Sequence, residues 1–179
     1  IVAARDAKGH ETTLTYDTQK HLFLTAQTSP ENYTAQTAWN AACQSPTSVT
    51  DINGNVTTTT YDVHCRETRM DFPNGHWKTT TYNDLGDPTL QNIETRQSTP
   101  NGPSSGSAYQ LSRAYINGFG ETYRTATSGT TPASDLISTR SAYDVRGRLT
   151  WQSVPLPFAD TSDPATISAN QKAFYSYDA

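Results

Sequence analysis

Few side chains in this sequence have the chemistry of a catalytic or metal site: two cysteines, four histidines and a set of aspartates. The histidines have no serine or cysteine nucleophile at a spacing that suggests a catalytic triad. His64 adjoins Cys65, but the paired Cys-x-x-Cys spacing of a zinc site is missing. We therefore expect neither a catalytic triad nor a metal centre.

The aspartates could supply the two carboxylates that a glycosidase needs. Most of them, however, stand where a turn opens, as in Asp6-Ala7-Lys8-Gly9, and turn formation explains them without catalysis. Residues 51–55 faintly resemble a calcium loop, but the glycine comes too early and no closing glutamate follows. We predict that the chain is not an enzyme and binds no cofactor.

An aromatic residue recurs at a near-constant interval in the first half of the chain. Tyr16, Trp39, Tyr61 and Tyr82 follow one another with a period of about 22 residues. A fixed period of this size is typical of repeat proteins, in which each unit buries itself only against its neighbours. The expected partners are therefore neighbouring repeats of the same polypeptide, and we expect the repeats together to build a surface, a shell or a spacer.

Residues that form turns recur between these aromatics, at intervals of about 8–12 residues, a spacing typical of consecutive short strands. They are Gly9, Lys20, Asn32, Cys43, Gly54, Cys65, Gly75 and Gly86. The runs between them are rich in threonine and aromatic residues, as in residues 56–61. This rhythm predicts antiparallel strands, because a parallel pair would need a crossover of about a dozen residues. In Asp144-Val145-Arg146-Gly147 the leading Asp and the closing Gly fit a type I turn.

Composition and patterning favour a sheet with much polar surface. The 179 residues include 30 threonines and 10 tyrosines, only 17% are charged, and mean hydropathy is -0.70. The net charge of -4 gives no reason to expect a nucleic acid or an anionic membrane as partner. No apolar run approaches the roughly 18 residues of a spanning helix, so we expect no membrane insertion.

Neither face of the expected strands is a clean apolar stripe. Along residues 76–82, one face carries His76 and Lys78 and the other carries Trp77 and Thr79. A β-sandwich needs an apolar face on each sheet, whereas a single layer with two partly solvated faces does not. The predicted fold class is all-β, an antiparallel meander of hairpins in a single-layer ribbon.

The pattern resembles the YD repeats of the Rhs family, in which a Gly, a short strand and Tyr-Asp are followed by two residues and Gly-Arg or Gly-Asn. The matching segments are Gly54-Asn55-Val56-Thr57-Thr58-Thr59-Thr60-Tyr61-Asp62, Tyr82-Asn83-Asp84-Leu85-Gly86, Tyr143-Asp144-Val145-Arg146-Gly147-Arg148 and Tyr177-Asp178. Tyr115-Ile116-Asn117-Gly118-Phe119-Gly120 is similar to a variant in Tc-toxin B components and SpvB-like proteins.

The resemblance implies an antiparallel ribbon that spirals into a hollow shell, in a secreted or cell-surface protein of bacteria. In Tc toxins and Rhs proteins the shell encloses a C-terminal toxin, so an enclosed toxin domain is an implied partner. In teneurins a related shell supports adhesion. The alternative is a module that presents Tyr and Trp rings to a cell-surface glycan or receptor. Exposed rings at Trp39, Trp77 and Trp151 would favour that alternative, and packed rings would favour the shell.

The repeat divides the chain into three parts. Residues 1–95 hold regular repeats with a period of about 22 residues, 96–112 form a Pro/Gly/Ser-rich loop, and 113–179 hold irregular repeats with longer loops. No Met begins the sequence, and we interpret the chain as a piece of a longer protein. The residues expected to hold the repeat together are Tyr16, Trp39, Tyr61, Asp62, Tyr82, Tyr115, Tyr143, Asp144, Gly147, Arg148, Tyr177 and Asp178.

Cys43 and Cys65 each follow a repeat aromatic at the same short distance, so they occupy equivalent turns one repeat period apart. In a flat meander, turns two strands apart are separated by roughly 9–10 Å, beyond the usual limit of about 7 Å between the Cα atoms of a disulfide. Twisting turns could close that gap. A disulfide and two unrelated free thiols both remain open at this point.

Overall fold

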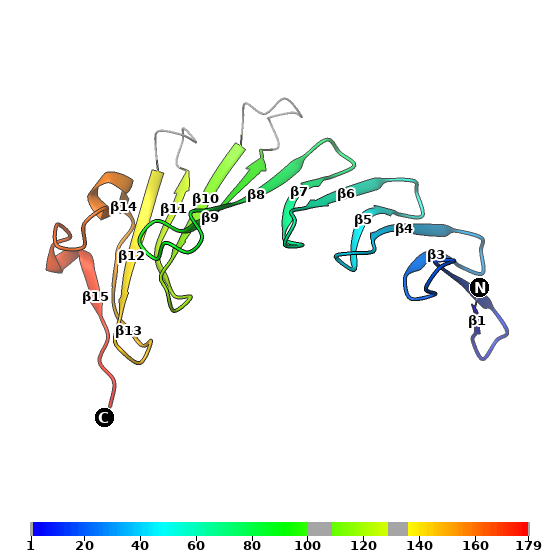
Figure 1. Cartoon of the computed structure of the whole chain (residues 1–179), viewed down its shortest axis with the longest axis horizontal. Coiled ribbons are helices and arrows are strands. Elements are labelled where there is room, and N and C mark those ends of the chain that lie inside the picture. The colour runs from blue at the N-terminus through cyan, green and yellow to red at the C-terminus, as the bar shows by residue number, and fades with distance from the viewer. Residues whose placement is uncertain (1, 100–108, 129–135, 179) are drawn as a thin grey trace. The chain divides into compact units, whose positions relative to one another are not determined.

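The computed structural model describes residues 2–99, 109–128 and 136–178. Their regular structure consists of strands and two short 3-10 helices, and the strands of each described pair run antiparallel (Figure 1). The predicted all-β meander with almost no helix is confirmed. The chain divides into two units, Ile1–Trp77 (unit 1) and Lys78–Ala179 (unit 2).

Unit 1 is a meander of seven strands, each paired antiparallel with the next along the chain. The strands are β1 (Val2–Arg5), β2 (Glu11–Tyr16), β3 (Leu24–Thr28), β4 (Thr34–Asn40), β5 (Ser45–Thr50), β6 (Val56–Tyr61) and β7 (Glu67–Asp71). These short runs, rich in threonine and aromatic residues, suit a pleated and partly solvated surface.

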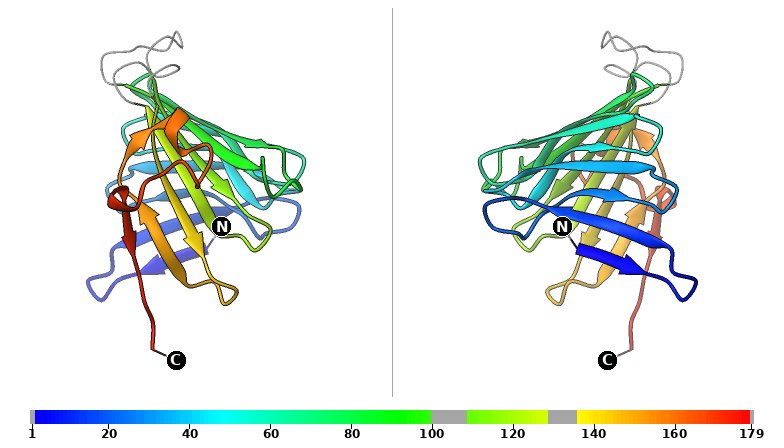
Figure 2. Two further views of the ribbon diagram at one scale, coloured as in Figure 1. Left: turned by 90° about the vertical axis from the view of Figure 1, so that its left-hand side faces the viewer. Right: turned by 90° about the vertical axis from the view of Figure 1, so that its right-hand side faces the viewer.

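Unit 2 continues the same pattern and adds an irregular segment. Its strands are β8 (Trp77–Asn83), β9 (Asn92–Ser98), β10 (Tyr109–Ile116), β11 (Thr122–Ser128), β12 (Leu136–Tyr143), β13 (Leu149–Ser153), β14 (Leu156–Pro157) and β15 (Lys172–Phe174). Strands β13 and β14 both pair with β12, and β15 pairs with β13. The helices η1 (Phe158–Thr161) and η2 (Ala169–Gln171) lie between β14 and β15. Figure 2 shows the strands of each unit side by side in one layer.

The two units bury their side chains very differently. In unit 1, none of residues 2–76 is buried, and Trp77 at its end is 7% exposed. In unit 2, Leu111, Ala126, Leu156 and Ile167 are buried together with polar residues. Single-layer sheets leave both faces open to solvent unless another segment covers one of them, and only unit 2 has such a segment among the described residues.

The pairing register shifts by one residue beside five of the repeat aromatics: Tyr16, Trp39, Tyr61, Tyr115 and Tyr143. The extra residue of each bulge lies on the following strand, and in four of the five it is a threonine: Thr25, Thr47, Thr68 and Thr150. The hydroxyls of Thr25, Thr68 and Thr150 each donate to the backbone carbonyl of the residue that precedes the aromatic, at 3.0 to 3.2 Å. A bulge increases local twist and re-aims a side chain, so it fixes where the aromatic points.

Most of the predicted turn positions are correct, and two are displaced by one residue. Gly9, Asn32, Gly54, Cys65, Gly75 and Gly86 have positive φ, as such turns require. The positive φ expected near Lys20 and Cys43 belongs to His21 and Gln44 instead. The turn after Asp17 is two residues longer and the turn after Asn40 one residue longer, because the Asp17 and Asn40 side chains accept hydrogen bonds from the extra backbone N–H groups.

Of the predicted loop at 96–112, residues 100–108 lie outside the described residues. On either side, β9 extends to Ser98 and β10 begins at Tyr109.

Candidate functional site

A single turn design recurs at the strand ends of both units. In the turn after Tyr61, the Asp62 carboxylate accepts the N–H groups of His64 and Arg66, at 2.8 and 3.0 Å, while Arg66 Nε donates to its second oxygen at 2.7 Å. The turn from Asp144 to Arg148 has the same three bonds. An ion pair between the first and fifth residues therefore spans each of these two turns.

The side chains at the first and fifth positions of this turn are complementary in each unit. The Asp6 carboxylate is hydrogen-bonded to the His10 ring, and the Asn55 amide donates to the Asp51 carboxylate. In the turn after Ile116 the acid stands at the fifth position instead, and the Asn117 amide donates to the Glu121 carboxylate at 2.7 Å. Hydrogen bonds to the carboxylates hold the pKa of Asp51, Asp62 and Asp144 below its ordinary value. As the sequence suggested, these carboxylates accept hydrogen bonds from groups of their own turns.

Several repeat aromatics donate to a carbonyl at the start of the preceding strand of the same unit. Tyr61 Oη bonds to the carbonyl of Pro46 at 2.8 Å and Trp39 Nε1 to that of Leu24 at 2.8 Å. Tyr143 bonds to the carbonyl of Thr122 in the same way, at 2.9 Å, and Tyr177, beyond β15, bonds at 3.0 Å to that of Leu149 at the start of β13, the strand that pairs with β15. Each bond ties the end of one strand to the neighbouring strand.

The remaining repeat positions lie on strands, in a turn or beyond the last strand. Tyr16 and Tyr82 are half-buried on β2 and β8, and Tyr115 is half-buried on β10. Asp178 is exposed beyond β15. Gly147 occupies the left-handed position of its turn with φ of 76°.

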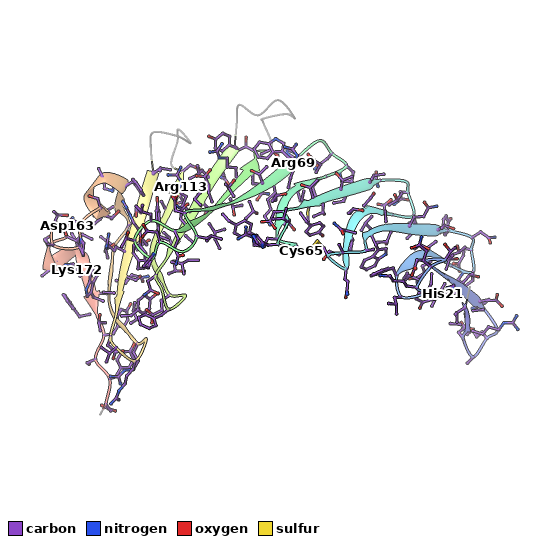
Figure 3. The ribbon with its side chains drawn as sticks, in the orientation of Figure 1. His21, Cys65, Arg69, Arg113, Asp163 and Lys172 are labelled. Atoms are coloured by element: carbon purple, nitrogen blue, oxygen red, sulfur yellow. A yellow bond between two sulfur atoms is a disulfide. The ribbon has the colours of Figure 1, made fainter. Side chains whose placement is uncertain are left out.

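Cys43 and Cys65 are joined by a disulfide in unit 1, with their Cα atoms 5.2 Å apart (Figure 3, where the sulfur atoms are yellow near Cys65). The separation of roughly 9–10 Å that a flat sheet gives for these two turns is longer than the observed distance between the Cα atoms. Both cysteines lie in turns beyond the strand ends, where the chain is no longer held at the interstrand distance. Cys65 also has left-handed backbone geometry, with φ of 62°, at the position that Gly54 and Gly75 occupy in the equivalent turns.

None of the three tryptophans is an exposed ring. Trp77 is buried with the Arg69 guanidinium 5.7 Å from its ring centroid, and Trp39 stacks on Phe23 with centroids 5.3 Å apart. Trp151 is half-buried beneath the Lys172 ammonium, 4.5 Å from its centroid. These contacts use the ring faces that a glycan would otherwise stack on.

A polar groove of about 410 Å³ lies on β8, β9 and β10 of unit 2. The strand register sets its floor in three cross-strand rows: Thr79 and Arg96; Thr81, Glu94 and Arg113; Asn83, Asn92 and Tyr115. Asp84 completes the lining. This set was not predicted from the sequence, because only the register brings together residues from three strands.

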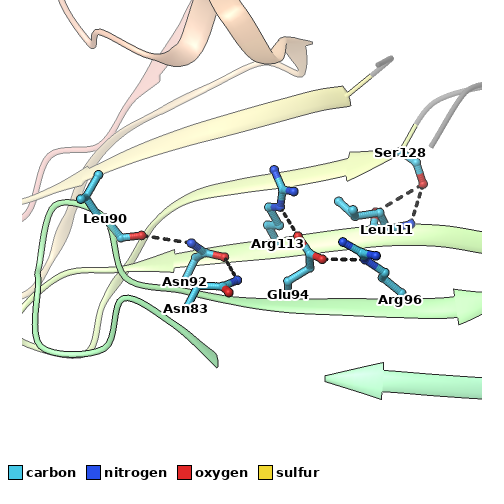
Figure 4. A network of polar contacts seen from close by, with 8 residues as sticks. All are labelled: Asn83, Leu90, Asn92, Glu94, Arg96, Leu111, Arg113 and Ser128. Carbon is cyan, nitrogen blue, oxygen red and sulfur yellow. Dashed lines mark hydrogen bonds and ion pairs between the residues drawn. The ribbon is translucent and has the colours of Figure 1, made fainter. Parts of the chain in front are cut away.

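Glu94 is the centre of this groove and is only 5% exposed. Its carboxylate accepts from Arg96 Nε at 2.6 Å and from Arg113 Nε at 2.5 Å (Figure 4). Burial raises the pKa of Glu94, but the hydrogen bonds from the two arginines outweigh it and the net pKa is lowered. Asn83 donates to Asn92 and Asn92 to the carbonyl of Leu90, both at 3.0 Å. The groove is therefore a fixed, ionised polar surface.

Within residues 2–99, 109–128 and 136–178, no group of three His, Cys, Asp or Glu side chains is arranged to hold a metal ion. Within the same ranges, no helix has the length and apolar character needed to span a membrane.

The fold is similar to that of a chain in the crystal structure of TcdB2-TccC3, with a TM-score of 0.63 and 13% identity over 90% of this chain and 10% of that chain. A structure of the Photorhabdus luminescens Tc holotoxin pore also matches, with a TM-score of 0.44 and 15% identity over 84% of this chain and 10% of that one. No protein-family model and no curated protein matches the sequence.

The first likeness shows the fold: this chain has a single-layer antiparallel meander of the kind present in TcdB2-TccC3. It spans about a tenth of the length of the chain that it matches.

Proposed function

We propose that this chain is a structural segment of the wall of a secreted toxin-carrier shell, built from YD repeats and enclosing another domain of a longer bacterial polypeptide. The segment does no chemistry of its own. Its partners are the neighbouring repeats and the enclosed toxin domain.

The observation that carries the proposal is the absence of any buried side chain among residues 2–76. A sheet of this kind cannot form an independent hydrophobic core, so its stability comes from neighbouring strands in register. The likeness of the meander to part of TcdB2-TccC3 supports the same reading.

The environment of the candidate residues supports a passive role. Asp62 and Asp144 are engaged within turns, and Cys43 and Cys65 are bonded to each other. The packed rings of Trp39, Trp77 and Trp151 favour a wall over a module that binds glycans through exposed aromatics.

Limited proteolysis of the full-length parent protein tests the proposal. Tyr61→Ala removes an aromatic that bonds to the neighbouring strand, so we expect the enclosed domain to become accessible to protease while its intrinsic activity is unchanged. Val63→Ala is the matched control, because Val63 is 93% exposed in the adjoining turn.

Equal protection of the enclosed domain in Tyr61→Ala and wild type would contradict the proposal. So would turnover of a substrate by this chain alone that is abolished by replacing one Asp or His. Saturable binding on a glycan array that is lost in Trp77→Ala would favour the binding module instead.

A further inference from the structure

One face of unit 2 already binds a stretch of polypeptide. Residues 158–162, here named the covering segment, lie over β11 and β12. Arg124 Nη2 donates to the carbonyl of Phe158, and Arg140 Nη1 donates to the carbonyls of Thr161 and Ser162 at 2.8 and 2.9 Å. The guanidinium of Arg124 also lies 3.6 Å from the centroid of the Phe158 ring. The face thus holds a peptide by its carbonyls and by one aromatic ring.

The polar groove continues that same face, and none of the described segments covers it. Tyr115 lines the groove, pairs with Arg124 in the register of β10 and β11, and lies 6.2 Å from Phe158 between ring centroids. Residues opposite each other in register point to the same side of a sheet. The covering segment therefore stands at one margin of the groove.

The groove repeats the chemistry of the covered region. Arg96 and Arg113 each use Nε to bind Glu94, and no hydrogen bond from the Nη groups of Arg96 to a described residue is present. The hydroxyls of Thr79 and Thr81 likewise make no hydrogen bond within the described parts of the chain. At the centre of the groove two guanidinium groups face the single carboxylate of Glu94, which leaves a local positive charge there, while Asp84 places a second carboxylate in the lining beside Asn83.

We propose that this groove is a binding site for a second polypeptide segment, acidic and carrying an aromatic side chain. Its carbonyl and carboxylate oxygens accept hydrogen bonds from Arg96 and Arg113, as the covering segment accepts them from Arg124 and Arg140. Its ring packs on Tyr115 from within the groove, as Phe158 packs beside Tyr115 at the margin. Arginine suits this role because its planar fork binds carboxylates and stacks on rings. The inference does not depend on the chain being part of a shell.

The test uses a synthetic peptide with the sequence of residues 157–163, Pro-Phe-Ala-Asp-Thr-Ser-Asp, because this segment is the structure's own example of such a ligand. Titrated into the isotopically labelled 179-residue chain, it is expected to bind saturably and to shift the amide resonances of Thr79, Thr81 and Glu94. A peptide with both aspartates replaced by asparagine should bind at least about tenfold more weakly, because charge-assisted hydrogen bonds are lost.

Two variants assign the binding to the groove. Arg96→Gln leaves the Glu94–Arg113 pair intact and should weaken binding about tenfold, and Thr79→Glu should weaken it by placing a carboxylate opposite Arg96. Arg69→Gln in unit 1 is the control and should bind as wild type does. Circular dichroism verifies that each variant is folded.

Any of four results would overturn the proposal. They are no saturable binding, equal affinity for the neutral peptide, resonance shifts confined to β11 and β12 through exchange with the covering segment, and binding of glucuronic acid in place of the peptide.

Discussion

Unit 1 and unit 2 share one pattern of strand, aromatic, bulge and turn, yet their side chains are buried to different extents. In unit 1 the side-chain links are at the strand ends: aromatic donors to carbonyls, complementary turn pairs and the disulfide. In unit 2 the covering segment adds a second layer and buries Arg124, Ser138 and Thr161. A polar single-layer sheet can therefore be held at its ends, whereas charged side chains are buried where a segment covers the sheet, as at Arg124, or where paired side chains enclose them, as at Glu94.

The largest expected effect in unit 2 comes from Arg124→Ala. The substitution removes a guanidinium packed against Phe158 and the donors that bind its carbonyl and Thr161 Oγ1. We expect unit 2 to lose about 2–4 kcal/mol of stability, measured by urea denaturation, with unit 1 unaffected. Arg146→Ala, in an exposed turn, is the control. An Arg124→Ala variant as stable as this control would show that the covering segment is held in another way.

A smaller effect is expected from Tyr61→Phe in unit 1 and Tyr143→Phe in unit 2. Each removes one hydroxyl that donates to a backbone carbonyl and leaves the ring in place. We expect a loss of about 0.5–1.5 kcal/mol in each unit, because the geometry is the same in both. Tyr33→Phe, at an exposed ring, is the control for thermal unfolding. A cost in only one unit would show that the repeat aromatics are not equivalent.

The smallest effect concerns pH and the turn pairs. Hydrogen bonds from Arg66 hold the pKa of Asp62 below its ordinary value of 3.8. Because the pKa is lower in the folded state, the ionised carboxylate stabilises the turn above that value, and this stabilisation is lost as pH falls through the folded-state pKa. Wild type should therefore lose stability below about pH 4 more steeply than Asp62→Asn. Melting temperatures that fall in parallel with pH would contradict this.

The sequence predicted the strands and the turns because both depend on local chemistry. The complementary pair of Asp62 and Arg66 lies within one turn, and the left-handed position falls on Gly54 or Gly75 wherever a glycine is available. The displaced turns at His21 and Gln44 were missed because their Asp17 and Asn40 side chains stabilise a longer loop. The bulge threonines, which follow the aromatics at a nearly constant distance, were a signal in the sequence that went unused.

The polar groove and the covering segment could not be predicted in the same way. Glu94 and Arg113 are 19 residues apart and meet only in the register of β9 and β10. Arg124 and Phe158 are 34 residues apart, and nothing local to either one indicates the other. The disulfide was left open because its geometry depends on turns beyond the strand ends rather than on strand spacing.

Hydrogen exchange on the intact chain, with and without a disulfide reductant, tests most directly whether unit 1 is stabilised at its strand ends and unit 2 by burial. The Cys43–Cys65 bond spans a separation of 22 residues, and closing a loop of that size is worth about 3 kcal/mol. Once the disulfide is reduced, we expect the amides of β4 to β7 to exchange roughly 100-fold faster and those of β9 to β12 to exchange at an unchanged rate. Equal acceleration in both units, or none in β4 to β7, would contradict this expectation.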